Sequence, residues 1–576
     1  MGESESGPVM TWWLFLSITI SVFGNSFLYG YNIGVVNSPA RMIKAFYKMT
    51  YLARDGVKTY YNSEDRNLYF TSLPESYANN FTVTTTVEPL GVAEPEAEPF
   101  GGSNDTSGGN GTLGVARDPF LAFTEEEIEA DNVIEILWSI TVAFFVFFGM
   151  IGAFSSGRIA DYFGRKKGMV LITFLMFLAG IFGGIPTVAK SPECVMVSRI
   201  FVGLHTGMGI SLASLYLAEI SPKKIRGAVG TCHQLFVTMG ILWSMVLGLP
   251  KLAGTWAAWP ALFAFNAVPS LVCLLFMPLC PESPRYLLIK KNDEEGARKA
   301  LRKLRGSGYS RIEDEIEEMK IEARKASSVE TFTMKKLLVT PELKLPLIIA
   351  IVVQIAQQWS GINAAMAYSS FIYTQANVPD SVIPYVVVGQ GAVNVISTIV
   401  SVPLMEKLGR RPLLIWPLCG MIASFIALTV CLNLLQDDAY AEQKNVLAII
   451  SIIAMLTFVI GFALGLGPIP YTIVSEIFRQ EPRAAAMSLS MAIQWTCNFI
   501  LLLTFRFIQK SIGAYTYLIF IVIMVASFIF LFIYVPETKN RTFDEIARAI
   551  ASGKEKKRRD YSEDEEEMQP MGRQSD

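Results

Sequence analysis

Long stretches of apolar residues are the feature that most constrains the fold of this chain. Twelve of them reach the ~20 residues that a helix needs to cross the hydrocarbon core of a bilayer. They lie at 12–36, 133–155, 168–189, 194–218, 228–249, 259–280, 345–375, 381–404, 412–433, 446–475, 485–508 and 513–535. Hydrophobic residues make up 52% of the chain and charged residues only 17%, too few to cover such a core in water. We therefore predict an all-α membrane protein with twelve transmembrane helices.

Composition also argues against several classes of protein. The formal net charge is −2, which does not suit a globally basic nucleic-acid-binding protein. The two histidines and seven cysteines show no metal-ligand spacing, so we expect no metal site, no cofactor and no disulfide framework. The sequence has neither a glycine-rich phosphate loop nor a nucleophile–base pair, and we expect no enzyme.

Basic residues are concentrated in alternate short loops between the apolar stretches. They lie at 158–167, 223–226, 407–411 and 479–483, and the segments 281–344 and 536–576 fall on the same side. The segment 42–131, on the other side, carries many acidic and few basic residues. The positive-inside rule therefore predicts that both termini are cytoplasmic and that 42–131 is extracellular.

The extracellular segment has the features of a glycosylated loop. It contains three N-x-S/T sequons, at Asn80, Asn104 and Asn110, on the side of the membrane where glycans are added. Residues 76–116 are rich in Thr, Gly, Pro and Glu, which predicts disorder. We expect at least one sequon to be used.

Three short motifs occur twice, in the same order and at nearly the same spacing. They are Asp161-x3-Arg165 and Glu406-x3-Arg410, then Glu219-x6-Arg226 and Glu476-x6-Arg483, then Pro281-Glu-Ser and Pro536-Glu-Thr. The chain is therefore predicted to contain two six-helix halves, 12–280 and 345–535. A cytoplasmic N-terminus (1–11), a helical linker (281–344) and a cytoplasmic tail (536–576) complete it. Two such halves around a central path are typical of transporters that alternate access by rocking.

The chain resembles the sugar porters of the major facilitator superfamily, most closely the animal facilitative hexose transporters. The similar strings are Gly157-x3-Asp161-x2-Gly164-Arg165-Lys166, Arg199-x3-Gly203-x3-Gly207, Pro281-Glu-Ser-Pro-Arg285, Gln357-Gln-Trp-Ser-Gly-Ile-Asn363, Gly467-Pro-Ile-Pro470 and Pro536-Glu-Thr-Lys-Asn. The likeness covers about residues 12–545, apart from the long loop. It implies the major facilitator fold, a hexose as substrate and a place in the plasma membrane.

Amide side chains inside the spans indicate where a sugar would bind. A sugar offers many hydroxyls and no charge, so its site needs amide donors and acceptors beside apolar or aromatic faces. Gln354, Gln357 and Gln358 share one face of the seventh span, and Pro468 and Pro470 predict a broken helix in the tenth. Any one amide could instead join helices by packing, but the set favours a binding site. By resemblance, the positions that contact the hexose are Gln234, Gln357, Gln358, Asn363, Asn394, Tyr471, Gln494, Trp495 and Asn498.

The charged residues of the repeated motifs are expected to form a gate. Ion pairs between the two halves would hold the inner end shut in the outward-open state, each contributing about 1 kcal/mol or less where exposed. Their simpler role would be to orient helix ends. By resemblance, the cytoplasmic gating network comprises Asp161, Arg165, Glu219, Arg226, Glu406, Arg410, Glu476 and Arg483.

Acidic residues lie only near the ends of the spans, which bears on energy coupling. Proton-coupled sugar porters carry an aspartate at the position of Asn32, and an amide cannot release a proton. We therefore predict a facilitative hexose uniporter. D-glucose is favoured because Tyr471 is a large aromatic residue where glucose transporters usually have tryptophan.

Several alternatives stay open. Gln494 stands where glucose transporters often have asparagine, and Gln354-Ile-Ala replaces the Gln-Leu-Ser of many glucose-preferring members. A fructose or mixed hexose uniporter is therefore one alternative. A proton-coupled sugar or polyol symporter is a second, and a non-transporting membrane sugar sensor is a third.

Overall fold

The structure, a computed structural model, forms two compact units. The residues that it describes are 10–54, 59–62, 67–70, 113–116, 131–222, 225–306, 309, 311–328, 334–478, 480–539, 541, 545–546 and 548–550. The smaller unit comprises Ala40–Trp138 and Thr187–Pro192, and the larger comprises Met1–Pro39, Ser139–Pro186 and Glu193–Asp576. Each unit is described by itself.

The smaller unit contains helix α3 (Ala40–Arg54) and a three-stranded antiparallel sheet in the order β1 (Thr59–Asn62), β2 (Asn67–Phe70) and β3 (Leu113–Ala116). Buried Lys44 on α3 forms an ion pair with Glu135. The all-α prediction missed this sheet, and the end of the segment expected to be disordered forms β3. Residues 76–112, with all three sequons, lie outside the described residues.

The first half of the larger unit contains six spans. The first span is one continuous helix with a π-helical turn in its middle, and the sixth has a break between two helical pieces. The elements are α1 (Trp12–Ser21), η1 (Val22–Phe27), α2 (Leu28–Gly34), α6 (Asn132–Phe163), which begins in the smaller unit, α7 (Arg165–Gly184), the short α8 (Pro186–Ala189), which continues into the smaller unit, α9 (Glu193–Ile220), α10 (Arg226–Leu247), α11 (Trp259–Ala264), α12 (Ala267–Phe276) and η3 (Met277–Leu279).

Short helices follow the first half. They are η4 (Tyr286–Lys290), α13 (Glu294–Arg305), α14 (Ile312–Ser328), α15 (Met334–Val339) and η5 (Pro341–Leu343). The sequence sets the bounds of α13 locally. The Asp293 side chain caps its start by accepting from the Gly296 N–H, and Gly306 ends it at φ 93°.

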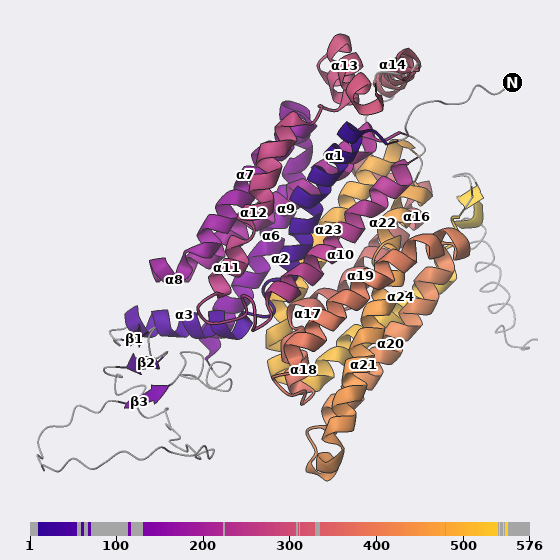
Figure 1. Cartoon of the computed structure of the whole chain (residues 1–576). Helices are drawn as coiled ribbons and strands as arrows, with labels where there is room; N and C mark the ends of the chain where they lie inside the picture. Colours follow the sequence, from indigo (N-terminus) through magenta and orange to yellow (C-terminus); the bar gives the residue numbers. More distant parts are fainter. Residues whose placement is uncertain are drawn as a thin grey trace, which may run out of the picture. The chain divides into compact units, whose positions relative to one another are not determined.

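The second half repeats the six spans, and its first and fourth spans are broken. The elements are α16 (Lys344–Trp359), α17 (Ile362–Ala367), α18 (Ser369–Gln375), α19 (Ile383–Leu408), α20 (Arg410–Leu434), η6 (Asp438–Gln443), α21 (Lys444–Leu464), α22 (Ile469–Ile477), α23 (Gln480–Ile512), η7 (Gly513–Tyr515) and α24 (Thr516–Tyr534). Figure 1 shows the long helices of the larger unit side by side, with α13 and α14 beyond their ends.

The twelve predicted spans agree with these helices. Ten helical stretches among the described residues are long and apolar enough to cross a membrane. One of them, Ala485–Tyr534, contains both α23 and α24, and a shorter apolar stretch, Cys232–Leu247, lies in α10. Large apolar side chains are exposed along the helices, as a lipid-facing surface requires, and Trp416 on α20 is 74% exposed.

Two helices, one in each half, begin with the same unusual backbone conformation. Gly164 precedes α7 at φ 90° and ψ 177°, and Gly409 precedes α20 at φ 92° and ψ 179°. This region of backbone space is essentially restricted to glycine. The repeated glycines of the first motif are thus explained by a turn that only glycine makes without strain.

A glutamate from a later segment caps each of these helices. Glu282 accepts hydrogen bonds from the first two backbone N–H groups of α7, at 3.1 and 3.0 Å, and Glu537 accepts from those of α20, at 3.0 and 3.1 Å. These N–H groups have no partner within the helix, and the carboxylate also complements the helix dipole. Burial alone would raise the pKa of the Glu537 carboxyl, but four backbone N–H donors outweigh it and hold that pKa below its usual range. The repeated Pro-Glu-Ser/Thr motif therefore serves as a helix cap.

Replacing Gly409 with alanine should destabilise the protein. The new Cβ would lie 2.6 Å from Glu537 Oε2, and this backbone conformation costs about 1–3 kcal/mol for a residue with a side chain. We expect a lower midpoint of thermal unfolding for the purified protein in detergent. Gly420 lies in the same helix with no atom within 4 Å of an added Cβ, so Gly420→Ala is the control and should leave the midpoint unchanged or higher. Equal midpoints for the two variants would contradict this account.

Candidate functional site

Three of the predicted amides meet at the break in the seventh span. Helix α16 ends at Trp359, Gly361 takes a left-handed conformation at φ 91°, and α17 begins at Ile362. The Asn363 amide donates to Gln358 Oε1 at 2.6 Å, and the Gln358 amide donates to Gln357 Oε1 at 3.4 Å. These side chains therefore form a short hydrogen-bonded chain across the break.

Gln357 extends this chain to the break in the tenth span. Its Nε2 donates to the carbonyl oxygens of Leu466 and Gly467, at 2.8 and 3.1 Å. These carbonyls lie between α21 and α22, where Pro468 and Pro470 have no N–H to offer a helix. The amide of Gln357 thus satisfies backbone groups that the hydrocarbon core of a membrane would leave unpaired.

Tyr471 and Gln494 contact each other beside the second break. Tyr471 lies in the first turn of α22, and its hydroxyl donates to Gln494 Oε1 on α23. Both side chains are half-buried. The pairing joins two of the positions at which the sequence departs from the glucose-transporter pattern described above.

Trp495 and Asn498 lie on the same helix, α23, and carry polar atoms without a partner. Trp495 Nε1 and Asn498 Oδ1 are buried and have no hydrogen bond among the described residues. Gln354 on α16 is similar, because its Nε2 and Oε1 atoms are also buried and have no hydrogen-bond partner among the described residues. Unpaired buried polar atoms are costly, so these three side chains are suited to a ligand that brings hydroxyls.

Gln234 and Asn394 stand apart from the other predicted residues. Gln234 is half-buried on α10 and Asn394 is buried on α19, two helices that pack against each other from opposite halves. Within the described part of the chain, no hydrogen bond joins either side chain to the amides of the seventh span. Their contribution to a common site therefore stays a prediction.

Tyr29 on α2 is a residue that the sequence analysis missed. Its ring centroid lies 6.4 Å from that of Trp495, in the other half, and 6.2 Å from that of Phe145. The side chain is half-buried and adds a first-half hydroxyl to the site. The only indication in the sequence was its place directly before Gly30-Tyr31-Asn32.

Asn32 contacts the deeply buried cation of the first half. Arg199 donates to Asn32 Oδ1 at 3.3 Å and to the Asn32 carbonyl at 3.2 Å, and its guanidinium lies 4.6 Å from the Phe145 ring centroid. The Asn32 amide donates in turn to Asn266 Oδ1 at 2.7 Å. The position that carries an aspartate in proton-coupled porters is therefore filled by an amide that both accepts and donates.

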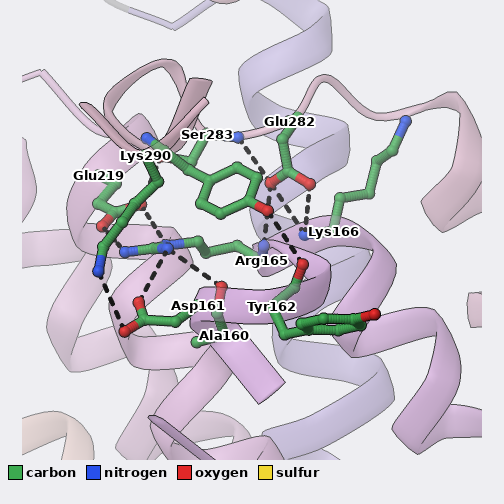
Figure 2. A network of polar contacts seen from close by, with 10 residues as sticks. Ala160, Asp161, Tyr162, Arg165, Lys166, Glu219, Glu282, Ser283 and Lys290 are labelled. Carbon is green, nitrogen blue, oxygen red and sulfur yellow. Dashed lines mark hydrogen bonds and ion pairs between the residues drawn. The ribbon is translucent and has the colours of Figure 1, made fainter. Parts of the chain in front are cut away.

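The charges of the repeated motifs pair within each half. Arg165 binds Glu219 through two hydrogen bonds of 2.9 Å, as Figure 2 shows, and Arg410 binds Glu476 at 2.8 and 3.1 Å. Ser283 donates to Glu219 in the first half, and Thr538 donates to Glu476 in the second. For these four charged residues the expectation of pairs between halves was wrong, because each arginine lies at the start of a helix beside the glutamate of its own half.

The other members of the predicted gate have different surroundings. Asp161 lies 3.2 Å from Lys290 and 4.0 Å from Arg165, and Glu406 is exposed. Arg483 donates to the Phe478 carbonyl at 3.3 Å. The side chain of Arg226 lies outside the described residues.

The two halves are hydrogen-bonded at the other end of the first span. Asn37, which follows α2, donates to Ser369 Oγ at 2.6 Å and accepts from the Ser370 N–H at 3.2 Å. Ser369 begins α18, the last piece of the broken seventh span. The broken helix is therefore in direct contact with the opposite half.

Comparisons with known proteins agree with this architecture. A family model described as "Sugar (and other) transporter" matches residues 17–550. The facilitated glucose transporter member 1 of solute carrier family 2 from Gallus gallus is 36% identical over 549 residues, which cover 95% of this chain and 96% of that protein. Member 4 from Mus musculus is 36% identical over 553 residues, which cover 96% and 94%.

Solved structures show the same fold. The partially occluded inward open conformation of the xylose transporter XylE from E. coli has a TM-score of 0.64 at 21% identity, covering 92% of this chain and 100% of that one. The proton:xylose symporter XylE bound to 6-bromo-6-deoxy-D-glucose has a TM-score of 0.62 at 21% identity, covering 93% and 99%. The chain has the twelve-helix major facilitator fold, and it belongs to the family of sugar transporters.

Proposed function

We propose that this membrane protein is a facilitative uniporter of a hexose, with D-glucose favoured, and that it works by alternating access in the plasma membrane. The observation that carries the proposal is the set of amides and aromatic rings around two broken helices, at Gly361 and at Pro468. Such breaks lie at the substrate site of many transporters. The relatives named above are facilitated glucose transporters by name, which supports the same substrate here.

The proposed sugar site draws on both halves. The second half supplies most of it, namely Gln357, Gln358, Asn363, Asn394, Tyr471, Gln494, Trp495 and Asn498. Gln234 belongs to the first half, to which we add Tyr29. Hydroxyl groups of a sugar would pair with the amides and with the unpaired Trp495 Nε1, while the Trp495 ring supplies an apolar face.

Uncoupled transport is supported by the surroundings of Asn32. A coupled porter needs a group that gains and loses a proton within the membrane. Here the contact to Arg199 is made by an amide, which does not titrate. The fold shared with the proton:xylose symporter keeps proton coupling as the alternative mechanism.

We further propose that the ion pairs of the repeated motifs keep the helix ends of each half together. Arg165–Glu219 and Arg410–Glu476 would let each half rock as a rigid body while gating residues at the inner end separate. Asp161, Arg226, Glu406 and Arg483 would complete this cytoplasmic gate. The proposal places both termini in the cytoplasm and the sequons Asn80, Asn104 and Asn110 outside the cell.

Transport should be measured with labelled D-glucose in liposomes that contain the purified protein. Because the Asn32 amide does not gain or lose a proton at physiological pH, uptake should stop at equal concentrations and should not respond to an imposed proton gradient. Protein-free liposomes are the control. Accumulation driven by acid outside would show proton coupling, and binding without uptake would favour a sugar sensor.

The same liposomes test the choice of hexose. Unlabelled glucose should inhibit uptake of labelled glucose more than an equal concentration of unlabelled fructose does, because Tyr471 supplies a large aromatic side chain at the site. Stronger inhibition by fructose would make the protein a fructose transporter.

Replacing Asn498 with leucine should weaken sugar binding. The variant could not form the buried hydrogen bond between the Asn498 amide and a sugar hydroxyl. This loss should cost about 1–3 kcal/mol, or roughly tenfold or more in affinity. The Asn433 amide donates to the Thr429 carbonyl of its own helix at 2.8 Å, so Asn433→Leu is the matched control. Glucose affinity is measured by calorimetry on the purified variants. If both substitutions changed affinity equally, Asn498 would not belong to the site.

Replacing Glu476 with glutamine should slow transport and spare binding. The Arg410–Glu476 pair has side chains that are 20% and 25% exposed, so its loss should shift the balance of conformations by about 1 kcal/mol, roughly fivefold. Uptake rate and glucose affinity are compared with those of Glu342→Gln, an exposed glutamate of the linker. A parallel loss of affinity would place Glu476 in the sugar site rather than in the gate.

A further inference from the structure

Two lysines converge on the cytoplasmic end of the sixth span, where the motif network leaves them unused. Lys166 Nζ donates to the Pro278 carbonyl at 3.2 Å, and Lys303 Nζ donates to the next carbonyl, that of Leu279, at 2.8 Å. In Figure 2 the Lys166 side chain extends away from the Arg165–Glu219 pair. The two ammonium groups therefore lie close together at one helix end.

Part of this arrangement has a structural role. Arg411, the second-half counterpart of Lys166, donates to the Phe532 carbonyl at 2.8 Å, so a cation at this place caps the last helix of each half. The capping role explains Lys166. It does not explain why a second cation, Lys303, lies at the same helix end, or why exposed Lys299 lies one turn earlier on α13.

Among the described residues, no ion pair neutralises the positive charge of this cluster, since no carboxylate there pairs with Lys166, Lys299 or Lys303. Burial lowers the pKa of the Lys303 ammonium, and the like charges of Lys166 and Lys299 lower it further. Like charges that are held together repel one another, and an anion bound between them would offset that repulsion.

The surroundings of the cluster fit the headgroup region of a bilayer. Lys303 Nζ lies 3.6 Å from the ring centroid of Trp13, and tryptophan is enriched at membrane–water interfaces. Next to it, Trp12 is 67% exposed, and Leu275 and Leu279 at the end of the sixth span are 62% and 52% exposed. α1 packs against α12, η3 and α13, so these apolar side chains belong to one neighbourhood.

We propose that Lys166, Lys299 and Lys303 bind the phosphate of an anionic phospholipid, whose acyl chains lie against Leu275, Leu279 and Trp12. The ammonium groups of Lys166 and Lys303 each keep N–H donors beyond the one used for a carbonyl, and phosphate is the anion that the adjacent leaflet presents. The bound lipid would link α13 to the first and sixth spans. The proposal does not depend on which sugar is carried.

Lipid retention by the purified full-length protein tests the site. The protein in neutral detergent is given equal amounts of phosphatidylserine and phosphatidylcholine, and the retained lipids are counted by native mass spectrometry. The wild type should prefer phosphatidylserine. Lys299→Gln should reduce this preference about fivefold and Lys299→Gln/Lys303→Gln by about fivefold more, with salt weakening it further.

Matched variants and a soluble competitor decide the outcome. Lys299→Arg/Lys303→Arg keeps the charges and should keep the preference, and Lys335→Gln removes an exposed linker lysine outside the cluster and should change nothing. Equal retention by Lys299→Gln and the wild type, or an equal loss in Lys335→Gln, would overturn the site. Displacement of the lipid by an equal concentration of inorganic phosphate would assign the site to a soluble anion instead.

Discussion

A carbonyl group freed by a break in a membrane helix must find a donor within the protein, because the hydrocarbon offers none. In this chain the break between α21 and α22 frees the carbonyls of Leu466 and Gly467, and the single amide of Gln357 donates to both. Gln357 itself lies just before the break of the seventh span at Gly361. One side chain therefore holds two irregular segments against each other, and the positions of the neighbouring amides and of Tyr471 depend on that contact.

The repeated motifs act at a different place, the first residues of helices α7 and α20. A glycine-only turn, a glutamate cap from a later segment and an arginine–glutamate pair occur once in each half. Each set ties the beginning of one helix to the ends of two others. Rocking requires halves that stay rigid while the contacts between them change, and under the proposed mechanism these sets would supply rigidity within a half. Hydrogen bonds between the halves lie elsewhere, as at Asn37 and Ser369.

The sequence predicted the features that depend on length, composition and repetition. Twelve apolar stretches, a break at two prolines and the two halves follow from those alone. It did not predict the partners of polar side chains, because two arginines and two glutamates can pair within or between halves, and only the backbone turn decides. Nor could it find Tyr29, since one aromatic residue in an apolar stretch is usually a packing residue. The sheet β1–β3 was missed because three four-residue strands leave little pattern in a segment dominated by turn-forming residues.

The surroundings of Asn32 show why an amide and not a carboxylate suits this position. Its nitrogen donates to the Leu28 carbonyl at 2.9 Å and to Asn266 Oδ1 at 2.7 Å, while its oxygen accepts from Arg199. An ionised aspartate is an acceptor only, so it would lose both donor contacts and face the oxygen of Asn266. A protonated aspartate has a single O–H donor, so it could keep only one of those contacts, and its contact with Arg199 would be weakened. With an amide all three contacts form without any proton moving, which suits the proposed transport driven by the sugar gradient alone.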